Sequence, residues 1–595
     1  MTHTINERVG RLRSWMEENG FTAFVFPSSD PHNSEYVADH WKSREWISGF
    51  SGSAGTAVLT LEHAALWTDS RYFIAAEKEL NGTGFQLMKL RVEGTPSVSE
   101  WLASELSTYE KAVVGLDGNV NSFAEVAAME QELATKGNIT VRTDADPMAE
   151  LWTDRPVIPD NMVSLHPLEY SGESTSSKVS RVRKHLLDCG ADGLLVTALD
   201  EIAWVLNLRG SDVHCNPVFV SYLLISPENI TLYINNVKLP DDVKAYLMSE
   251  HIDVQAYESV VEGLRLYAGK SLLVDMSSTN YSLATAVPFE KVCSGVSPIA
   301  SMKAVKNKVE QDGFRAAMLR DGVAVVKFLA WLKSAVEAGG QTEISLDERL
   351  TALRAEQPKF KGISFDTIVG YEAHGAIVHY EATPETDIPV QPHGLVLIDS
   401  GAQYLDGTTD ITRTIALGEL SEEQRRVYTL VLKGHIQLDR CRFPAGACGS
   451  QIDALARAPM WREGYNYMHG TGHGVGSYLN VHEGPHQIRM EWRPAPLQAG
   501  MTVTNEPGIY LEGKFGVRIE NTLLIVPAES TAFGDFLKFE TLTLAPIDTA
   551  PIVLEMLSTE EREWLNNYHR RVYESLSPYL EGNEKEWLRK ATLPI

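Results

Sequence analysis

Two stretches in the first half of the chain share one order of hydrophobic and polar positions. In ERVGRLRSWMEENGFTAFVF, apolar residues recur at helical spacing, Gly20 closes the pattern, and a short apolar strand follows at 24–26. The later stretch SRVRKHLLDCGADGLLV repeats this order, with Gly190 closing the helical pattern and an apolar strand at 194–196. The repetition predicts a helix followed by a buried strand in both places, as in α/β folds.

The similarity between the two halves continues beyond these first elements. Trp46-Ile47 leads to a Gly-Ser pair, and Trp204-Val205 leads to another at the same spacing. Each half then offers a further strand, in AALWTDSRYF and in ITLYINNV. We therefore predict two related α/β domains at residues 1–158 and 159–303, separated near the Pro-, Ser- and Gly-rich segments DRPVIPDN and LEYSGESTSS. Chance similarity between the halves is the alternative.

The remainder of the chain has a different pattern. A long helical periodicity begins at KNKVEQDGFRAAMLRDG and ends at Gly339-Gly340, and we interpret its apolar stripe as core packing. From about residue 360, short β-rich runs such as GLVLIDSG and MTVTNEPGIYL alternate with Gly-rich turns, and the tail from LSTEEREWLNN onward predicts closing helices. We predict a third, α+β domain at residues 304–595.

Length, charge and cysteine content narrow the class of protein. A chain of 595 residues is too long for a single core, which agrees with several domains. The net charge of −26 argues against nucleic acid and against a membrane surface as partners. Five scattered cysteines argue against structural disulfides, and the charged N-terminal stretch has no apolar segment of the kind that signal peptides carry. We therefore expect a cytoplasmic protein.

Five acidic and histidine residues in the third domain indicate a metal site. Asp399 ends the apolar run VLID, and Asp410 follows through a Gly-Thr-Thr turn, so that a β-hairpin would bring the two carboxylates together from opposite strands. His473 lies in the glycine-rich stretch HGTGHGVG. Glu506 and Glu520 lie in TNEPGIYLEGKFGVRIENT. Carboxylate oxygens with one imidazole suit divalent ions such as Mn²⁺, Co²⁺ or Zn²⁺.

The number of these residues favours two ions over one. Five protein ligands exceed what a single catalytic ion keeps when it must leave positions open for water and substrate. Two ions that share some carboxylates can together hold and activate one water molecule. Each residue alone has a plainer interpretation, as a turn aspartate, a surface histidine or a strand glutamate paired with a neighbouring arginine. The five together predict a two-metal hydrolase.

These motifs resemble those of the Xaa-Pro aminopeptidase (aminopeptidase P) family, within the group that includes prolidase, methionine aminopeptidase and creatinase. The stretches SSDPHNSEYVADHWKSREWISGFSGSAGTAVLT, LRGSDVHCNPVFVSYLLI and WLNNYHRRVYESL resemble the long, three-domain cytosolic form. The resemblance covers almost the whole chain. It implies two creatinase-like α/β domains, a pita-bread α+β metallopeptidase domain with a C-terminal extension, and a homodimer.

The resemblance also implies how the metal ligands are shared. Asp399 would bind one ion, and His473 and Glu506 would bind the other. Asp410 and Glu520 would bridge the two. The cofactor expected from the family is a pair of divalent ions per subunit, Mn²⁺ in the first place, with Zn²⁺ and Co²⁺ as alternatives.

Five further residues are implied to act on the substrate. His379 in GAIVHY, His469 in MHGTG and His482 in VHEGP would hold the peptide and stabilise the oxyanion. Arg71 in TDSRYF resembles a substrate contact that the first domain supplies. Arg518 resembles an arginine beside the bridging glutamate, and we expect it at the substrate-binding site as well.

The predicted function is a dinuclear metallo-aminopeptidase that removes the first residue from short peptides with proline in second position. Glu506 is the group expected to accept the proton of the attacking water, because it is the carboxylate expected to bind only one ion. The alternative within the enzyme class is a prolidase, which splits Xaa-Pro dipeptides with the same ligands. The alternative outside it is a non-catalytic peptide-binding module of the same fold.

Overall fold

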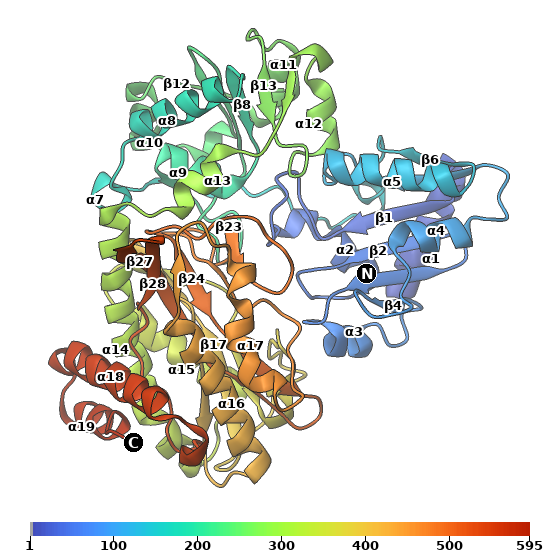
Figure 1. Ribbon diagram of the computed structural model, residues 1–595. Helices are drawn as coiled ribbons and strands as arrows, with labels where there is room; N and C mark the ends of the chain where they lie inside the picture. Colours follow the sequence, from blue (N-terminus) through green and yellow to red (C-terminus); the bar gives the residue numbers. More distant parts are fainter. Residues whose placement is uncertain (1–3) are drawn as a thin grey trace. The chain divides into compact units, whose positions relative to one another are not determined.

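The computed structural model of this chain describes residues 4–595 and divides into two compact units. The first unit contains the residues up to Leu165 together with Ser174–Ile299, and the second contains His166–Glu173 together with Ala300–Ile595. Figure 1 colours these segments from blue at the N-terminus to red at the C-terminus. The two units are described separately below.

The first half of unit one is a six-stranded sheet with helices packed on it. Its strand order is β4-β3-β2-β1-β5-β6. Phe24 and Leu66 belong to the apolar cluster on one face of this sheet, and Val25 and Trp67 belong to that on the other. The strands are β1 (Ala23–Pro27), β2 (Thr56–Thr60), β3 (Ala64–Thr68), β4 (Gln86–Lys89), β5 (Ala112–Leu116) and β6 (Ile139–Arg142). The longer helices are α1 (Ile5–Asn19), α2 (Ser43–Ser48), α3 (Phe73–Glu79), α4 (Val98–Glu105) and α5 (Phe123–Lys136).

The second half of unit one repeats this topology. Its strand order is β12-β11-β10-β8-β13-β14, and each pair of neighbours has the same parallel or antiparallel sense as its counterpart in the first sheet. The strands are β8 (Gly193–Val196), β10 (Tyr222–Ile225), β11 (Ile230–Tyr233), β12 (Ile252–Gln255), β13 (Leu272–Val274) and β14 (Val292–Ser294). The helices include α8 (Thr175–Asp188), α9 (Leu199–Leu206), α10 (Asp241–Ser249), α11 (Val260–Arg265), α12 (Tyr281–Ala286) and, partly beyond this unit, α13 (Pro298–Ala304).

The two glycines singled out in the sequence have the same backbone role. Gly20 follows helix α1 with φ of 75°, and Gly190 follows helix α8 with φ of 76°. Both lie in the left-handed region where a helix commonly ends and where glycine has no steric penalty. The strands that follow, β1 and β8, hold equivalent places in their sheets. The prediction of two related α/β folds is therefore confirmed.

The domain boundaries at 158/159 and 303/304 stay predictions, because both six-stranded sheets belong to the same compact unit. A segment of the first half explains this joining. His32 is buried, and its ring nitrogens lie 3.0 Å from the Thr197 carbonyl oxygen and 3.0 Å from the Tyr257 hydroxyl, both in the second half.

Unit two is built around the long helix that the sequence predicted. Helix α14 (Lys308–Ala338) begins with a capping box at Asn307 and ends at Gly339, whose φ is 82°. Its apolar residues enter two core clusters. Val326 packs in the cluster that contains α16 (Glu422–Asp439) and α18 (Thr559–Leu576). Phe328 packs in the cluster that contains α15 (Glu343–Ala355) and β17 (Leu395–Ser400). The other helices include α17 (Asp453–Trp461) and α19 (Gly582–Ala591).

Several small sheets of unit two bear the predicted site residues. Their strand orders include β16-β17-β20, β21-β28-β27-β24, β22-β23 and β25-β26. The strands are β16 (Ile368–Tyr371), β17 (Leu395–Ser400), β20 (Ile411–Ala416), β21 (Arg442–Pro444), β22 (Gly472–Gly474), β23 (Glu483–Ile488), β24 (Thr502–Asn505), β25 (Gly508–Leu511), β26 (Phe515–Arg518), β27 (Asn521–Thr531) and β28 (Gly534–Thr541). A further sheet, β15-β18-β19, contains Phe360–Ile363, Ala402–Tyr404 and Gly407–Thr408. The predicted α+β character of the third domain is confirmed.

None of the helices among residues 4–595 combines the length and the apolar character needed to cross a bilayer.

A buried histidine of α18 makes the stability of this unit sensitive to acid. His569 accepts a hydrogen bond from the Ile547 amide at 3.1 Å, and burial, with the nearby Arg413 charge, lowers the pKa of His569 to about 4. The unfolded pKa is near 6.5. Since the folded-state value is the lower one, the stability contributed by neutral His569 is present above about pH 6.5 and is lost as pH falls toward 4.

We expect His569→Gln to flatten this pH dependence, because glutamine can accept the Ile547 hydrogen bond and cannot take up a proton. The measurement is the free energy of unfolding of metal-free protein in urea at several pH values between about 6.5 and 4. An unchanged slope in the variant would contradict the assignment.

Candidate metal centre

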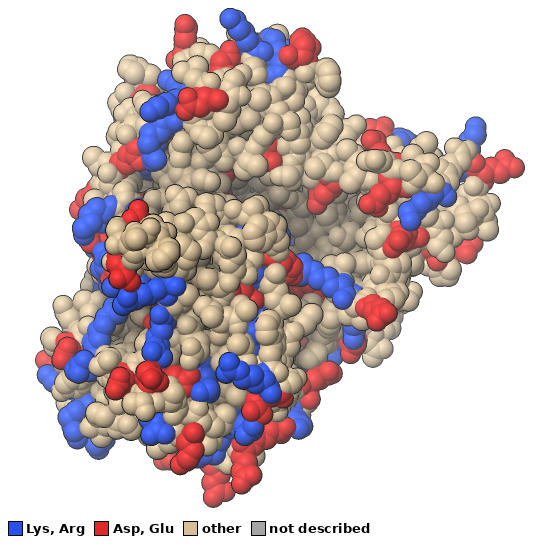
Figure 2. Space-filling model, viewed as in Figure 1, with Lys and Arg blue, Asp and Glu red and all other residues tan. Residues whose placement is uncertain are grey.

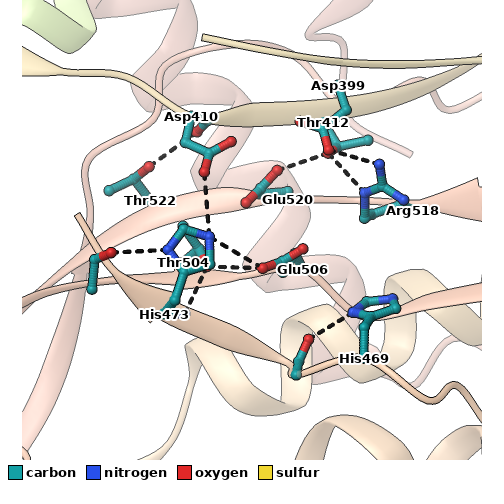
Figure 3. Close-up of polar contacts among 12 residues, drawn as sticks. Asp399, Asp410, Thr412, His469, His473, Thr504, Glu506, Arg518, Glu520 and Thr522 are labelled. Atoms are coloured by element: carbon teal, nitrogen blue, oxygen red, sulfur yellow. Dashed lines mark hydrogen bonds and ion pairs between the residues drawn. The ribbon is translucent and has the colours of Figure 1, made fainter. Parts of the chain in front are cut away.

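Figure 3 shows predicted ligand residues from several strands of unit two pointing toward one another. Asp410, His473 and Glu520 each offer one ligand atom, and these atoms all lie within 4.8 Å of one another. The fourth neighbour is Glu506. His473 Nε2 lies 3.4 Å from Asp410 Oδ2 and 3.4 Å from Glu506 Oε1. The spacing of these carboxylate oxygens and the imidazole nitrogen suits the coordination of a metal ion.

The two aspartates lie on or beside paired antiparallel strands, although not in the simple hairpin that the sequence predicted, because β18 and β19 lie between β17 and β20 along the chain. Asp399 is in β17 and pairs in register with Thr412 of β20, and Asp410 immediately precedes β20. Both side chains are buried. Asp399 Oδ1 has no hydrogen-bond partner in the part of the chain that the structure describes. A buried carboxylate oxygen in this state is costly unless a cation completes its contacts.

A glycine allows His473 to reach the site. A Cβ atom on Gly472 would come within 1.9 Å of the Thr504 carbonyl oxygen of β24, so only glycine lets β22 lie this close to β24. The His473 amide then donates to Thr504 Oγ1 at 3.0 Å. His473 Nδ1 lies 2.9 Å from the Gly474 carbonyl oxygen, which can only accept. Nδ1 therefore carries a proton, and Nε2 faces the carboxylates as metal-binding histidines do.

The two glutamates are adjacent because their strands pair. β24 and β27 are antiparallel with Asn505 opposite Asn521, so Glu506 just after β24 lies beside Glu520 just before β27. Thr504 Oγ1 donates to Glu506 Oε1 at 3.2 Å. Glu520 accepts a hydrogen bond from the Thr412 hydroxyl at 2.7 Å. The antiparallel pairing of β24 with β27 thus brings together two glutamates that are fourteen positions apart in the sequence.

The carboxylates disturb one another strongly in the metal-free protein. Burial, together with the charge of Asp399, raises the pKa of Glu506 to about 7, although the Arg518 guanidinium acts in the opposite direction. Burial raises the pKa of Asp410 and of Glu520 well above the usual range, and neighbouring carboxylates add to both shifts. Like charges this close cannot all ionise without a compensating cation. The donor set, the orphaned Asp399 oxygen and these shifts all fit divalent ions.

Arg518 is held inside this cluster. Its side chain is 2% exposed and donates to Asp399 Oδ2 at 2.6 Å, to the Tyr510 hydroxyl at 2.7 Å and to the Thr412 hydroxyl at 3.2 Å. This placement favours the predicted position beside the ligands. The substrate contact expected of Arg518 stays a prediction, since the guanidinium is engaged by protein groups.

The three predicted histidines lie around the ligands in different ways. The His482 ring packs edge-on against His473, with the ring centroids 4.3 Å apart. His469 Nε2 lies 2.8 Å from the Tyr510 hydroxyl, which in turn accepts from Arg518. His379 follows Val378, whose carbonyl oxygen accepts a hydrogen bond from Arg518 at 3.5 Å. All three are partly exposed, as residues that meet a substrate must be.

Arg71 lies in unit one, where it forms a bidentate pair with Asp69, with nitrogen–oxygen distances of 2.9 and 2.8 Å. Its predicted substrate contact stays a prediction.

Sequence reasoning missed three residues that support the ligands. Thr412 and Thr504 each lie two positions from a ligand carboxylate and hydrogen bond to one. Alternation along a strand places positions two apart on the same face, so this spacing was a usable signal. Tyr510 joins Arg518 to His469, and its role gave no signal because its partners come from separate segments.

Family profiles match the chain along nearly its whole length. The profile described as metallopeptidase family M24 matches residues 312–527, and that for the C-terminal region of peptidase M24 matches 535–595. Two profiles of the creatinase/prolidase N-terminal domain match 8–149 and 154–310.

Curated relatives match over the full chain. Aminopeptidase P1 of Arabidopsis thaliana is 39% identical, with 99% of each chain covered. The chain belongs to the Xaa-Pro aminopeptidase family. Xaa-Pro aminopeptidase 1 of Dictyostelium discoideum is 40% identical, over 99% of this chain and 97% of its own.

Solved structures of the family and its neighbours agree in fold. The X-prolyl aminopeptidase of Caenorhabditis elegans, described as a cytosolic enzyme with a di-nuclear active site, has a TM-score of 0.95, 35% identity and full coverage of both chains. An Xaa-Pro dipeptidase from Bacillus anthracis is 25% identical with a TM-score of 0.52, over 64% of this chain and 100% of its own. These likenesses confirm the creatinase-like and pita-bread architecture of this Xaa-Pro aminopeptidase family member.

We expect His473→Ala to bind fewer than two ions per chain and to lose most turnover, because the variant removes the one imidazole from the ligand set. Metal content after dialysis, measured by mass spectrometry of the elements, is the primary readout. His469→Ala is the matched control, since it removes a nearby histidine outside the ligand set and should keep its metal. Two tightly bound ions and full activity in His473→Ala would contradict the ligand assignment.

Proposed function

We propose that this protein is a metal-dependent aminopeptidase that releases the first residue from peptides with proline in second position. The observation that carries the proposal is the convergence of Asp410, His473 and Glu520, with Glu506 beside them, in a chain whose full length matches Xaa-Pro aminopeptidases. The site contains ligands, proton acceptors and histidine donors, which together suffice for hydrolysis of a peptide bond.

We assign five ligands to two ions. Asp399 would hold one, His473 and Glu506 the other, and Asp410 and Glu520 would be shared. When bound, the pair of divalent ions supplies Lewis acidity and lowers the pKa of water. The carboxylate-rich set with one imidazole favours Mn²⁺, with Zn²⁺ and Co²⁺ as alternatives. The di-nuclear site described for the C. elegans enzyme supports two ions in this chain.

Proton transfer is assigned to Glu506. Glu506 is a carboxylate assigned to one ion alone, which leaves it an oxygen that can accept the proton of the attacking water. A base of this kind contributes about 10²- to 10⁴-fold in rate. The neighbouring Thr504 hydroxyl, which donates to Oε1 at 3.2 Å, orients the carboxylate for this task.

Stabilisation of the oxyanion is assigned to the histidines. His482 packs against the ligand His473, and His379 follows a carbonyl that Arg518 contacts. A hydrogen bond from an imidazole N–H to the developing oxyanion becomes stronger as the negative charge grows. His469, joined to Arg518 through Tyr510, would hold the peptide beside them.

Selectivity for proline requires a site without a hydrogen-bond acceptor for the amide nitrogen after the scissile bond. Proline after the scissile bond gives an amide without an N–H and with φ fixed near −65°. A site for this bond must bind the ring by shape and must present no acceptor that needs a proton from that nitrogen. The faces of His379 and His482 could pack on the pyrrolidine ring.

We further propose a cytoplasmic homodimer that acts on short peptides, with domains at 1–158, 159–303 and 304–595. The domain proposal is supported by the profile matches at 8–149 and 154–310, and the cytoplasmic proposal by the cytosolic C. elegans relative. The homodimer rests on family resemblance. Arg71 is proposed as a substrate contact from the first domain.

Acidic and basic side chains are interspersed on the face shown in Figure 2, and the chain carries a net charge of −26. This charge supports peptides over nucleic acid as partners.

We expect His482→Ala to lower kcat by about 10²- to 10⁴-fold while the metal content stays that of the wild type. The reason is that His482 acts on the transition state and is not itself a ligand. Steady-state kinetics and metal analysis are made on the same preparation. Loss of metal from this variant would place His482 among the ligands and would overturn the assignment.

We expect a tripeptide with proline in second position to be cleaved with a kcat/KM about 10- to 200-fold above that of its alanine analogue, because ring packing of this size is worth about 1–3 kcal/mol. Equal values would leave a metallo-aminopeptidase and remove the proline claim.

Comparing Xaa-Pro with Xaa-Pro-Xaa substrates also separates the prolidase alternative. A prolidase would prefer the dipeptide, whereas the proposed enzyme prefers the longer peptide. A chain that binds both ions and cleaves neither would be the non-catalytic peptide-binding module.

A further inference from the structure

A fully buried histidine lies directly behind the two ligand glutamates. His435 belongs to α16 and is 0% exposed. Its Nδ1 lies 3.1 Å from the Asn505 carbonyl oxygen, and its own carbonyl oxygen accepts from Asn505 Nδ2 at 2.9 Å. On the other side of the ring, Asn521 Nδ2 lies 3.1 Å from His435 Nε2. One imidazole therefore joins the last residue of β24 to the first residue of β27.

The direction of these hydrogen bonds is fixed by Arg413. Arg413 Nη2 donates to Asn521 Oδ1 at 2.9 Å, which turns the Asn521 amide so that its NH₂ group faces His435. His435 Nε2 must then accept, so the ring proton is on Nδ1 and is donated to the Asn505 carbonyl. The four residues form a single chain of bonds that runs from Arg413 through Asn521 and His435 to Asn505.

His435 keeps this arrangement because it stays neutral. Burial, with the neighbouring Arg413 charge, lowers the pKa of His435 to about 3. A second ring proton would point at the Asn521 NH₂ group and would break the chain of bonds. The imidazole is thus a fixed spacer between two strands over the neutral pH range.

Each end of the spacer adjoins a metal ligand. Asn505 immediately precedes Glu506, and Asn521 immediately follows Glu520. Arg413 also donates to the Glu520 carbonyl oxygen at 2.6 Å, so the backbone of this glutamate is held as well. A shift of His435 would change the separation of Glu506 and Glu520, whose strands pair at Asn505 and Asn521.

We propose that His435 is a positioning residue for the metal centre, which sets the separation of Glu506 and Glu520 through the asparagines beside them. The inference rests on the proposed metal site and deepens it. Nothing in the ligand motif itself indicates this role, because His435 lies far from both glutamates in the sequence and touches neither carboxylate.

Helix α18 completes the support. The Trp564 ring packs edge-on against His435 with the centroids 5.8 Å apart, and the Tyr568 hydroxyl accepts from Arg413 Nη2 at 3.0 Å. Trp564 and Tyr568 stack on each other along α18. This helix, which belongs to the region of the chain matched at 535–595, thereby contacts two members of the chain of bonds.

The test uses two substitutions that each keep one half of the bridge. The side chain of His435→Asn reaches the place of Nδ1 and loses the contact with Asn521, and that of His435→Gln reaches the place of Nε2 and loses the contact with Asn505. His569→Asn and His569→Gln are the matched controls, because His569 is also fully buried and neutral and bonds to Ile547, which is not next to a ligand.

Titration calorimetry of metal-free protein with Mn²⁺ is the readout, together with the unfolding temperature of the same metal-free samples. We expect both His435 variants to bind at least one ion about 10- to 100-fold more weakly, as loss of groups that orient metal ligands does. We expect the His569 variants to keep wild-type affinity even where their unfolding temperature falls equally.

Wild-type affinity for both ions in the His435 variants would overturn the proposal and leave the proposed function standing. Equal losses of affinity in the His435 and His569 pairs would also overturn it, because the effect would then come from general destabilisation. A wild-type protein that takes up no ions would overturn the proposed function and this inference together. If one His435 variant does not fold, the other gives the same decision.

Discussion

Unit two gathers several carboxylates in one buried place, where burial and mutual repulsion both oppose their ionisation. Asp399, Asp410 and Glu520 are buried and Glu506 is partly so, and burial, with the charge of Asp399, raises the pKa of Glu506 to about 7. The Arg518 guanidinium supplies a fixed counter-charge to Asp399. The remaining negative charge is available to divalent cations. Folding therefore prepares a site whose electrostatic strain is relieved by the ions that catalysis needs.

Hydrogen bonds with at least one neutral partner hold this site in shape. The Thr412 and Thr504 hydroxyls donate to the glutamates, and Arg413, behind the site, donates to carbonyl, amide and hydroxyl oxygens with no carboxylate acceptor in the described chain. An ion pair at this position would compete with the metal ions for the ligand carboxylates. A guanidinium that is satisfied by neutral acceptors instead fixes strand positions without neutralising the ligands.

Some of these features can be predicted from the sequence and others cannot. The difference is how far apart along the chain the residues lie that form each feature. Helix ends at Gly20 and Gly190 and the strands after them are local, so the related α/β folds could be predicted from pattern alone. The convergence of Asp399 and Asp410 needed only one antiparallel pair. His435 and Tyr510 could not be found in this way. Their partners lie in segments far along the chain, and a lone histidine in a helix has no pattern that separates it from any other core residue. The domain boundaries and the predicted substrate contact of Arg71 depend on how separate segments of the chain pack together. The spacing of motifs along the sequence does not specify that packing.

Selectivity within this family must come from groups outside the ligand set. The Xaa-Pro dipeptidase from B. anthracis shares a similar fold over 64% of the present chain. Ligand carboxylates respond to the charge that develops at the scissile carbonyl, which is the same in a dipeptide and in a longer peptide. The ligand carboxylates therefore do not distinguish a dipeptide from a peptide that continues after the proline. That discrimination requires contacts on the leaving side, where a free carboxylate in the dipeptide replaces an amide in the longer substrate. A cation that pairs with that carboxylate favours the dipeptide, and Arg518 is drawn away from this role because Asp399, Tyr510 and Thr412 already engage its guanidinium.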